Sequence, residues 1–414
     1  MVLYIITMKF VRQGQSVALR GVGIFALRGM PALPCPTRLG DVEFMSYICS
    51  GKLLRKMEKV IISGDVCRTL AEVLGQVEYD RLFVLCDETT RRLCYPVLEG
   101  MEELQGAVHI TIGATDTHKT LRTMEQVWTE MGRGGGTRHS LMLNLGGGMV
   151  TDLGGFAAST FKRGIPFINI PTTLLSMVDA SVGGKTGINF GGLKNEIGVF
   201  NQPLTVVIDT QFLRTMDAEN VRSGYAEMLK HGLISDTETY GELMGFDLDR
   251  IDYKHLADMV GRSVAVKERI VEEDPTERGI RKALNLGHTV GHAFESFALQ
   301  FEGMEDNPRG IRPFLHGYAV AWGLVCELYL SCVKTGFPTD IMRQAVQFIR
   351  EAYGSLPITC DDYPQLYDYM THDKKNTAGT INFTLLGGIG DIRINQTATK
   401  EEIYEMLDFF REGL

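Results

Sequence analysis

The sequence predicts an α/β domain with a parallel, doubly wound sheet, followed by a mainly α-helical domain. Three observations support this prediction. Short apolar strands alternate with helical stretches as far as Asp209, a glycine-rich turn joins one strand to the next helix, and long helical patterns dominate after Asp217. A regular succession of strand, turn and helix is typical of parallel sheets covered by helices. A chain of 414 residues is also long for one core and suits two domains.

The predicted elements follow in chain order. Strands are expected at 59–64, 82–86, 109–113, 140–145, 166–170 and 204–209. Helices are expected between them at 66–76, about 119–131 and 150–161. The later helical patterns are 221–234, 253–273, 280–299, 317–334 and 338–352, and a hairpin is expected from 380–386 and 390–395. The two predicted domains are therefore 58–216 and 217–414, with a ligand expected in the cleft between them.

The first 57 residues differ from the rest of the chain. Between Met1 and Gly40 there are five lysines or arginines and no acidic residue, and no apolar period is sustained. The opening is too short and lacks the preceding basic residues of a signal peptide. An organelle transit peptide would fit this composition. Because Met57 directly precedes the first strand pattern, we favour a non-native or disordered upstream extension and place residues 1–57 outside the fold.

Composition limits the classes of partner. A formal net charge of −9 argues against nucleic acid, since the phosphate backbone selects basic surfaces. No apolar run approaches the ~20 residues that a membrane span needs. The eight cysteines form no CxxC pair, which favours free thiols in a reducing cytoplasm. We therefore expect a cytoplasmic enzyme that meets an anionic small molecule with local positive charge.

The first motif is the turn GGGMVTD, which ends at Asp152 and starts a helix. Unpaired N–H groups and the helix dipole favour a pyrophosphate at such a position. Glycine turns are also often merely tight, and Asp152 would then be a capping acid. Asp87, in DETT, ends another strand at the same sheet edge, as a ribose-binding carboxylate would. Asp116 and Lys119 follow the third strand.

The second motif is PTTLLSMVDASVGGKTGINFGGLKN. Thr172 and Thr173 are the residue type that caps a helix, and capping alone would explain them. Lys185 and Lys194 lie within ten residues of each other in what reads as a glycine-dense loop, which indicates a cradle for an anion. GGKT is similar to part of a P-loop, but the upstream glycine is missing at the required spacing, so a Walker motif is rejected.

The third motif is spread over the helical half, in GYAEMLKHG, ALNLGHTVGHAFE and FLHGYAVAWG. Glu227 lies among small apolar residues, His288 and His292 are one helical turn apart, and His316 opens a further helix. One carboxylate with imidazoles from separate helices is typical of an open catalytic site for Zn²⁺ or a similar ion. Spacing alone does not decide between His288 and His292 as the ligand.

Positive and amide side chains surround this motif in the sequence. Arg281 and Asn285 precede His288 at i−7 and i−3, which would put Asn285 on its helix face. Each of the others would ordinarily be a solvent-facing charge: Arg163, Lys230, Lys267 and Lys374.

Together, these separated motifs closely resemble 3-dehydroquinate synthases, sugar-phosphate cyclases that carry NAD and a divalent metal ion. The resemblance extends from residue 59 nearly to the end of the chain. It implies a Rossmann-like NAD-binding domain followed by a helical metal- and substrate-binding domain. The family usually has a glutamate where Asp116 stands here.

The resemblance also assigns roles to residues. The metal ligands for Zn²⁺ or Co²⁺ would be Glu227, His288 and His316, with His292 a second-sphere histidine near the substrate. The NAD contacts would be Asp87, Thr90, Asp116, Lys119, Gly148, Met149, Val150, Thr151, Asp152, Thr172, Thr173, Lys185, Lys194, Phe212, Leu213, Arg214 and Thr215. The substrate-side residues would be Arg163, Asp179, Lys185, Asn195, Lys230, Lys267, Arg281, Asn285, His292 and Lys374.

The implied activity is the conversion of 3-deoxy-D-arabino-heptulosonate 7-phosphate to 3-dehydroquinate and phosphate, a step of chorismate biosynthesis. It would proceed by transient oxidation with bound NAD, phosphate elimination, reduction, ring opening and aldol closure. We also expect a homodimer. Two alternatives remain: a related cyclase that makes valiolone- or inosose-type products, and a metal-dependent dehydrogenase of the glycerol-phosphate type. A non-catalytic NAD-binding module fits poorly with so full a set of polar residues.

Overall fold

The computed structural model describes residues 6–13, 16–24, 59–191, 193–304, 306–372 and 380–413. The chain divides into two compact units, Met1–Met57 and Glu58–Leu414. In the first unit, β1 (Ile6–Gln13) and β2 (Ser16–Ile24) pair antiparallel. No hairpin was predicted here, although Ile6–Phe10 alternates apolar and polar residues over the first five positions of β1.

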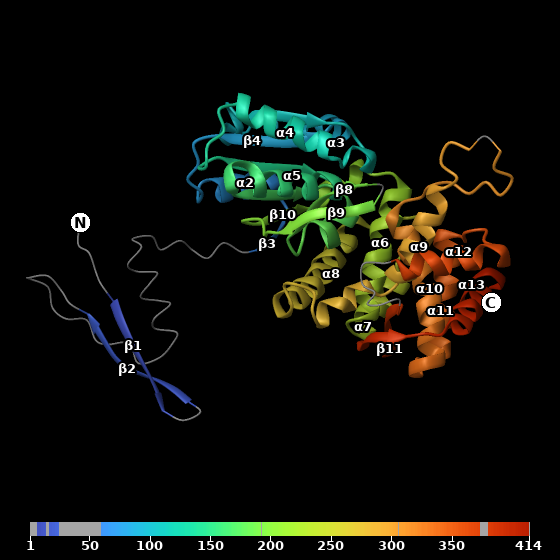
Figure 1. Cartoon of the computed structure of the whole chain (residues 1–414). Helices are drawn as coiled ribbons and strands as arrows, with labels where there is room; N and C mark the ends of the chain where they lie inside the picture. The colour runs from blue at the N-terminus through green and yellow to red at the C-terminus, as the bar shows by residue number, and fades with distance from the viewer. Residues whose placement is uncertain are drawn as a thin grey trace, which may run out of the picture. The chain divides into compact units, whose positions relative to one another are not determined.

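A six-stranded parallel sheet forms the α/β part of the second unit (Figure 1). Its strands, in spatial order, are β3 (Val60–Ser63), β10 (Val206–Asp209), β7 (Phe167–Pro171), β6 (Leu141–Gly146), β4 (Leu82–Asp87) and β5 (Val108–Ile112). All six were predicted. The four central strands β10, β7, β6 and β4 are buried throughout, as expected for a sheet covered on both faces.

The helices of this part are α2 (Val66–Leu74), α3 (Glu88–Leu93), α4 (Leu121–Arg133) and α5 (Gly148–Thr160). The chain moves toward β5 through α2 and α3, and then back toward β10 through α4 and α5. Since parallel crossovers are right-handed, the two pairs of helices cover opposite faces of the sheet. The reversal places a topological switch point between β4 and β6, where open sheets of this kind bind ligands.

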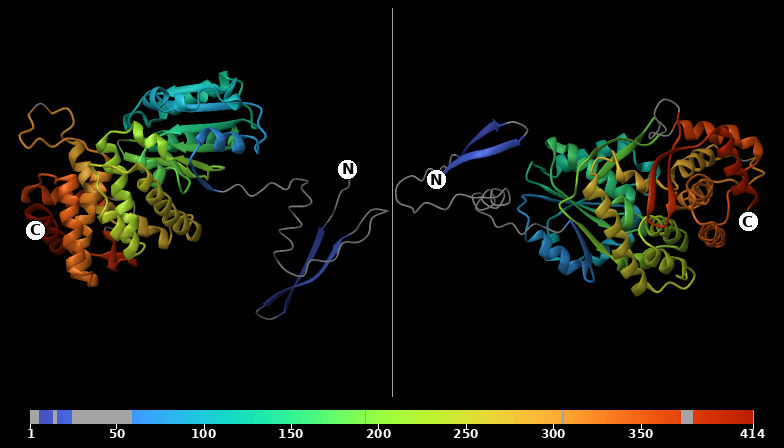
Figure 2. Two further views of the ribbon diagram at one scale, coloured as in Figure 1. Left: turned by 180° about the vertical axis from the view of Figure 1, so that it is seen from behind. Right: turned by 90° about the horizontal axis from the view of Figure 1, so that it is seen from below.

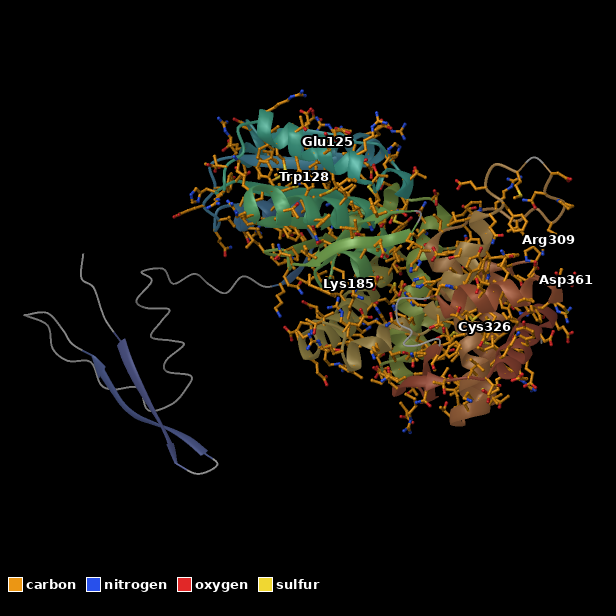
Figure 3. The ribbon with its side chains drawn as sticks, viewed as in Figure 1. Glu125, Trp128, Lys185, Arg309, Cys326 and Asp361 are labelled. Carbon is orange, nitrogen blue, oxygen red and sulfur yellow. The ribbon has the colours of Figure 1, made fainter. Side chains whose placement is uncertain are left out.

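Close packing of α5 explains two glycines of the DLGGF segment. A Cβ on Gly154 would lie 2.0 Å from Asn144 Oδ1 on β6, and one on Gly155 would lie 2.7 Å from Thr186 Cγ2. Trp128, labelled in Figure 3, donates from Nε1 to Ala157 O at 3.3 Å and so joins α4 to α5. These glycines therefore serve packing, whereas the three that precede them form the turn at the sheet edge.

The segment read as a glycine-dense loop is in fact an antiparallel hairpin. β8 (Lys185–Phe190) pairs with β9 (Leu193–Phe200), and β8 packs on α5. Lys185 therefore starts one strand and Lys194 lies on the other, so the loop prediction was wrong. The glycine content masked the alternating apolar residues that stabilise this hairpin.

The helical part follows β10 (Figure 2). Its helices are α6 (Ala218–Leu233), α7 (Thr237–Met244), α8 (Tyr253–Glu273), α9 (His288–Leu299), α10 (His316–Thr335), α11 (Thr339–Tyr353), α12 (Tyr363–Thr371) and α13 (Lys400–Glu412). The expected hairpin is β11 (Asn382–Gly388) with β12 (Asp391–Thr397). Buried α10 contacts α6, α9, α11 and α13, which makes it the centre of this part. Within the described ranges, no helix is long and apolar enough to cross a membrane.

The single helix predicted over 280–299 is broken. A 3₁₀ segment, η7 (Ile280–Asn285), ends before Leu286, and α9 begins only at His288. Gly287 between them has φ +80°, a left-handed conformation that favours glycine and interrupts a helix. Asn285 therefore does not share a helix face with His288, and that inference from spacing was wrong.

Candidate active site

The carboxyl edge of the sheet brings the first predicted residues together at the switch point. Asp87 ends β4, and Gly146 ends the neighbouring β6. Asp87 Oδ1 accepts from Thr90 N at 2.8 Å, and Asp87 N donates to Thr90 Oγ1 at 3.0 Å, so this pair caps α3. The stretch Gly148–Asp152 forms the first turn of α5 beside this cap. Val150 N and Thr151 N donate to Gly147 O, so the amides left for a phosphate at this helix start are those of Gly148 and Met149.

Lys119 ties three segments together at this edge. Its ammonium donates to Asp152 Oδ2 at 2.6 Å and also to Asn195 Oδ1 on β9. Lys119 is buried, and Asn195 has φ +51°, an uncommon backbone conformation for a residue with a side chain. Burial raises the pKa of Asp152, although Lys119 opposes this effect. The predicted cofactor residues Lys119 and Asp152 thus lie beside the predicted substrate residue Asn195.

The adjoining threonines behave differently from each other. Thr173 Oγ1 accepts from Ser176 N at 3.2 Å, as a helix cap does. Thr172 Oγ1 is buried and has no hydrogen-bond partner among the described residues. A buried hydroxyl without a partner is costly, which supports a bound ligand as its partner.

Two further predicted cofactor contacts, Phe212 and Leu213, are buried in the 3₁₀ segment η6 (Thr210–Thr215).

Asp179 and Lys267 join the two parts of the unit. Asp179 lies in the π-helical turn η5 (Ser176–Ala180), and Lys267 lies on α8. Lys267 Nζ donates to Asp179 Oδ1 at 2.6 Å and also contacts the backbone carbonyl of Asp179. Burial alone would raise the pKa of Asp179, but Lys267 holds it well below its usual range. Burial lowers the pKa of Lys267 in turn.

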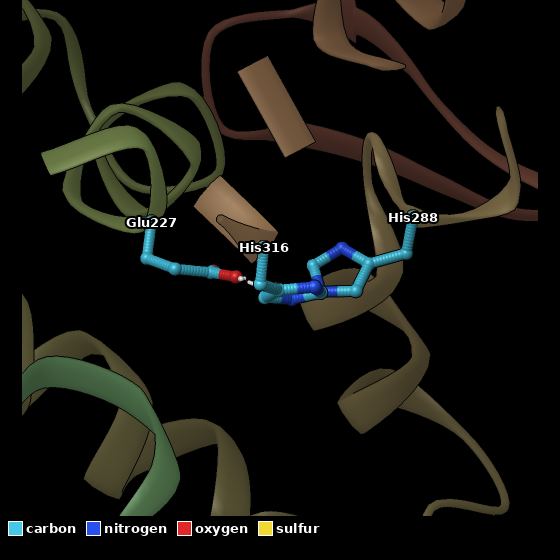
Figure 4. A group of neighbouring side chains, drawn as sticks. All are labelled: Glu227, His288 and His316. Carbon is cyan, nitrogen blue, oxygen red and sulfur yellow. Dashed lines mark ion pairs between the residues drawn. The ribbon is translucent and has the colours of Figure 1, made fainter. Parts of the chain in front are cut away.

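Glu227, His288 and His316 converge from three helices (Figure 4). Glu227 Oε1 lies 3.4 Å from His288 Nε2 and 3.5 Å from His316 Nε2. Tetrahedral Zn²⁺ with ligands at about 2.0–2.1 Å requires ligand atoms roughly 3.3 Å apart, so these separations fit such an ion. Both Glu227 oxygens are buried, and Oε1, which faces the two histidines, has no hydrogen-bond partner of normal geometry among the described residues. The donor set and its geometry therefore fit a divalent metal.

The other nitrogen of each histidine ring is held in place. His288 Nδ1 lies 3.1 Å from Leu286 O, and His316 Nδ1 lies 3.3 Å from Glu295 Oε2. Both Nε2 atoms are thereby left to face Glu227, the arrangement expected of metal ligands. Burial would lower the pKa of His316, but Glu295 and Glu227 raise it to about 10. The position at His316 Nε2 therefore favours positive charge.

Other charged groups crowd this cluster. Lys230 pairs with Glu227 Oε2 one helical turn away, and both side chains are almost fully buried. Burial would raise the pKa of Glu227, but Lys230 and His288 hold it well below its usual range. The ring of His292 lies 5.4 Å from that of His288 and 5.9 Å from that of His316, between centroids. His292 thus borders the cluster.

Two glutamates of the site were not identified from the sequence. Glu295 on α9 accepts from Lys194 Nζ at 2.8 Å, and Glu277 binds both Lys185 and Asn285. Lys185 is labelled in Figure 3. Glu295 lies seven residues after His288 and three after His292, so its place on their helix face was the available signal.

Arg281 is buried in the wall between the two parts. It donates from Nη2 to Gly183 O at 2.9 Å and from Nη1 to Pro275 O at 2.7 Å. Burial lowers its pKa. These bonds fix its guanidinium beside the segment that leads into β8.

Four predicted residues are not brought into this cluster. Arg163 is exposed in η4 (Phe161–Arg163), at the opposite end of α5 from the phosphate turn. Asp116 is exposed in η3 (Asp116–His118) and accepts from Asn189 Nδ2 at 3.0 Å. Arg214 is exposed and stacks on the ring of Tyr253. Lys374 lies outside the described residues.

Comparison with known proteins agrees with this geometry. Residues 109–223 match the family model described as 3-dehydroquinate synthase N-terminal, and residues 224–376 match 3-dehydroquinate synthase C-terminal. A 3-dehydroquinate synthase of Parabacteroides distasonis is 56% identical over 356 residues, which are 86% of this chain and 98% of that protein. One of Listeria innocua is 36% identical over 316 residues, 76% of this chain and 83% of that protein.

Solved structures show the same fold. A 2-epi-5-epi-valiolone synthase from Streptomyces hygroscopicus, with NAD⁺ and Zn²⁺ bound, is 26% identical with a TM-score of 0.72, and the match covers 87% of this chain and 99% of that one. A 2-deoxy-scyllo-inosose synthase, complexed with carbaglucose-6-phosphate, NAD⁺ and Co²⁺, gives a TM-score of 0.71 at 24% identity over 86% and 96% of the two chains. Fold and site thus define a sugar-phosphate cyclase. Within that class the chain belongs to the 3-dehydroquinate synthase family.

Proposed function

We propose that the chain converts 3-deoxy-D-arabino-heptulosonate 7-phosphate to 3-dehydroquinate and phosphate in chorismate biosynthesis. The observation that carries this proposal is the Glu227–His288–His316 cluster, which lies in one unit with the phosphate-type turn at the sheet edge and is bordered by lysines. Family membership supports the same substrate.

NAD would bind at the switch point between β4 and β6. Its pyrophosphate would rest on the first N–H groups of α5, those of Gly148 and Met149, with Asp87 at the end of the neighbouring strand for a ribose. Thr172 would give its unpartnered hydroxyl to the same ligand. Lys119 would hold Asp152 near the reacting part of the dinucleotide.

A divalent ion would bind to Glu227, His288 and His316. When bound, NAD would supply a reversible hydride acceptor and the ion a Lewis acid beside the substrate oxygen. Elemental analysis of the protein decides between Zn²⁺ and Co²⁺.

The remaining residues would bind and orient the substrate. Lys230, Lys267 and Arg281 place positive charge in a mostly buried site, where it acts on an anion with little screening. Lys185, Asn195, Asn285 and His292 would add hydrogen bonds to its hydroxyl, carboxylate and phosphate groups. Fixed donors of this kind accelerate a reaction by orientation and electrostatics. Arg163 and Lys374 stay predicted substrate contacts.

The related cyclases are the second candidate, because they share the fold. Lys267, Asn285 and His292 keep the pattern of the dehydroquinate enzymes and favour the heptulosonate phosphate. The test is a phosphate-release assay that compares this substrate with sedoheptulose 7-phosphate and glucose 6-phosphate, with and without chelator. Release from the heptulosonate phosphate alone, abolished by the chelator, is expected. Release from either other sugar phosphate instead would assign a different cyclase.

We also propose a homodimer in which two copies meet through β9. Every residue of β9 is exposed, including Leu193, Ile197, Val199 and Phe200. Its outer edge pairs with no other strand in the described part of the chain. An exposed apolar edge strand is a liability unless a partner covers it. Sedimentation should show a dimer that Ile197→Glu dissociates, while Val333→Glu, at a still more exposed apolar position on α10, should leave it intact.

We propose a cytoplasmic location because the described cysteines form no disulfide. Six cysteines lie within the described ranges, and all six are free thiols. Free thiols are typical of reducing compartments. Labelling with a thiol reagent in intact cells and in lysates would test this location.

A further inference from the structure

We propose that Glu295 is a positioning residue that joins the metal ligand His316 to Lys194, so that metal binding and dinucleotide binding support each other. The part that concerns the dinucleotide rests on the proposed function. Nothing in the sequence motifs assigned a role to Glu295.

The contacts of Glu295 carry this proposal. Its side chain is 6% exposed, in the middle of α9. Oε2 lies 3.3 Å from His316 Nδ1, and Oε1 accepts from Lys194 Nζ at 2.8 Å. Each carboxylate oxygen therefore serves a different partner, one in the helical part and one on the hairpin that packs on α5.

A carboxylate behind a ligating histidine fixes the ring and raises its basicity. Here the Nδ1 contact with Glu295 leaves His316 Nε2 to face Glu227 Oε1 at 3.5 Å. His316 and Lys194 each contact one oxygen of Glu295, and both partners suit a carboxylate. Removal of its charge should therefore weaken the metal site without removing a ligand.

Glu295 also lies close enough to His292 and His316 to form an alternative metal group. The ammonium of Lys194 argues against that role, because it already occupies Oε1. A cation bound directly to Glu295 would have to share the carboxylate with this positive charge. The positioning role is consistent with both contacts.

The same contacts connect the metal site with the dinucleotide site. A metal ion on His316 Nε2 fixes the ring, the ring orients Glu295, and Glu295 holds Lys194 on β9. Lys194 is a predicted NAD contact, so a metal-loaded site presents this lysine in an ordered position. Coupling of this kind is reciprocal, and bound NAD should strengthen metal binding by the same factor.

The first test is a titration of the metal-free protein with Co²⁺, followed by its visible absorption. Glu295→Gln should weaken Co²⁺ binding by about 10–100-fold while it keeps the shape of the spectrum, because all three ligands remain. Glu272→Gln is the matched control, because Glu272 forms an exposed ion pair with Lys59 at 2.7 Å. The Co²⁺ affinity of this control variant should equal that of the wild-type protein. Wild-type affinity in Glu295→Gln, or a spectrum that reports a lost ligand, would overturn the proposal.

The second test measures NAD affinity by calorimetry, with and without Co²⁺. The wild-type protein should bind NAD about fivefold or more tightly when Co²⁺ is present. This ratio of affinities should fall to near one in Glu295→Gln and in Lys194→Met. Lys194 is half-exposed on β9, so Lys194→Met keeps the test available if Glu295→Gln does not fold. A ratio that both variants retain would refute the link. If the wild-type protein binds no NAD, the proposed function fails, and the Co²⁺ titration still decides the role of Glu295 toward His316.

Discussion

Lys267 Nζ lies 2.6 Å from Asp179 Oδ1, which joins α8 of the helical part to the turn after β7 in the α/β part. The lysine side chain is 6% exposed and the aspartate 26% exposed. A pair so little exposed is weakly screened, and loss of one partner leaves the other charge uncompensated. This contact thus holds together the two walls of the site.

We predict that Asp179→Asn lowers the free energy of unfolding near neutral pH by about 1–3 kcal/mol. The folded pKa of Asp179 lies below its unfolded value. Such a group contributes stability above the unfolded pKa, and the contribution is lost as pH falls through the folded value. The difference from wild type should therefore shrink below about pH 4.

Urea unfolding from neutral to acid pH measures this effect. Asp258→Asn is the control, because Asp258 is an exposed aspartate on the same helix as Lys267. A constant difference between Asp179→Asn and wild type across the whole range would show that the ion pair is not its origin.

We predict that Glu227→Gln, His288→Ala and His316→Ala each lose the metal and the activity, whereas His292→Ala keeps the metal. The reason is geometric: both ligand histidines face Glu227 Oε1 through Nε2 within 3.5 Å. Elemental analysis of the purified variants is the measurement. A metal-free His292→Ala with a loaded His316→Ala would reverse the assignment.

Glu327 should position His288 through the backbone N–H groups on either side of that residue. This buried residue of α10 accepts from Gly287 N at 2.7 Å and from Thr289 N at 3.1 Å, at the start of α9. A carboxylate there also stabilises the helix dipole. Glu327→Gln would turn an amide N–H₂ toward these donors, and we expect a loss of about 1–3 kcal/mol in unfolding free energy.

Chemical denaturation and a metal titration together check this prediction. The metal affinity should fall as well, because His288 is the first residue of α9. Glu351→Gln, an exposed site that accepts from Gln347, is the control and should change neither quantity. Unchanged metal affinity in Glu327→Gln would show that His288 is held by Leu286 O alone.

We predict that residues 1–57 are dispensable. Every residue assigned a role lies at or beyond Asp87, and the structure divides the chain after Met57. A chain that begins at Met57 should fold, bind NAD and turn over like the full chain. Aggregation, or loss of NAD binding in a stable product, would place the leader in the domain. A change in sedimentation would instead show that the leader contacts a partner subunit.

The sheet was predictable because its strands are short, apolar and separated by helices. Each of the six lies where the pattern placed it, and in the four central strands burial on both faces leaves little choice of residue. The hairpin β8–β9 was missed for a physical reason as well. All of β9 is exposed, so its alternating apolar residues do not mark a buried face, and Gly191 before it and Gly198 within it are typical of a loop.

The site was predictable in its chemistry but not in all its geometry. Motif residues identified Glu227, His288 and His316, which the structure brings together. The break at Gly287 was not foreseen, because helical periodicity continues across it. Glu277 and Glu295 were missed because their roles depend on partners 92 and 101 residues away, Lys185 and Lys194.

The most direct test follows the whole reaction by NMR. The protein would be supplied with the heptulosonate phosphate, the divalent metal and a catalytic amount of NAD, while NADH absorbance is recorded. The account predicts 3-dehydroquinate and phosphate in equal amounts, many turnovers for each NAD, and no accumulation of NADH. Consumption of substrate with NADH formed in step, and without a cyclised product, would contradict it and identify a dehydrogenase.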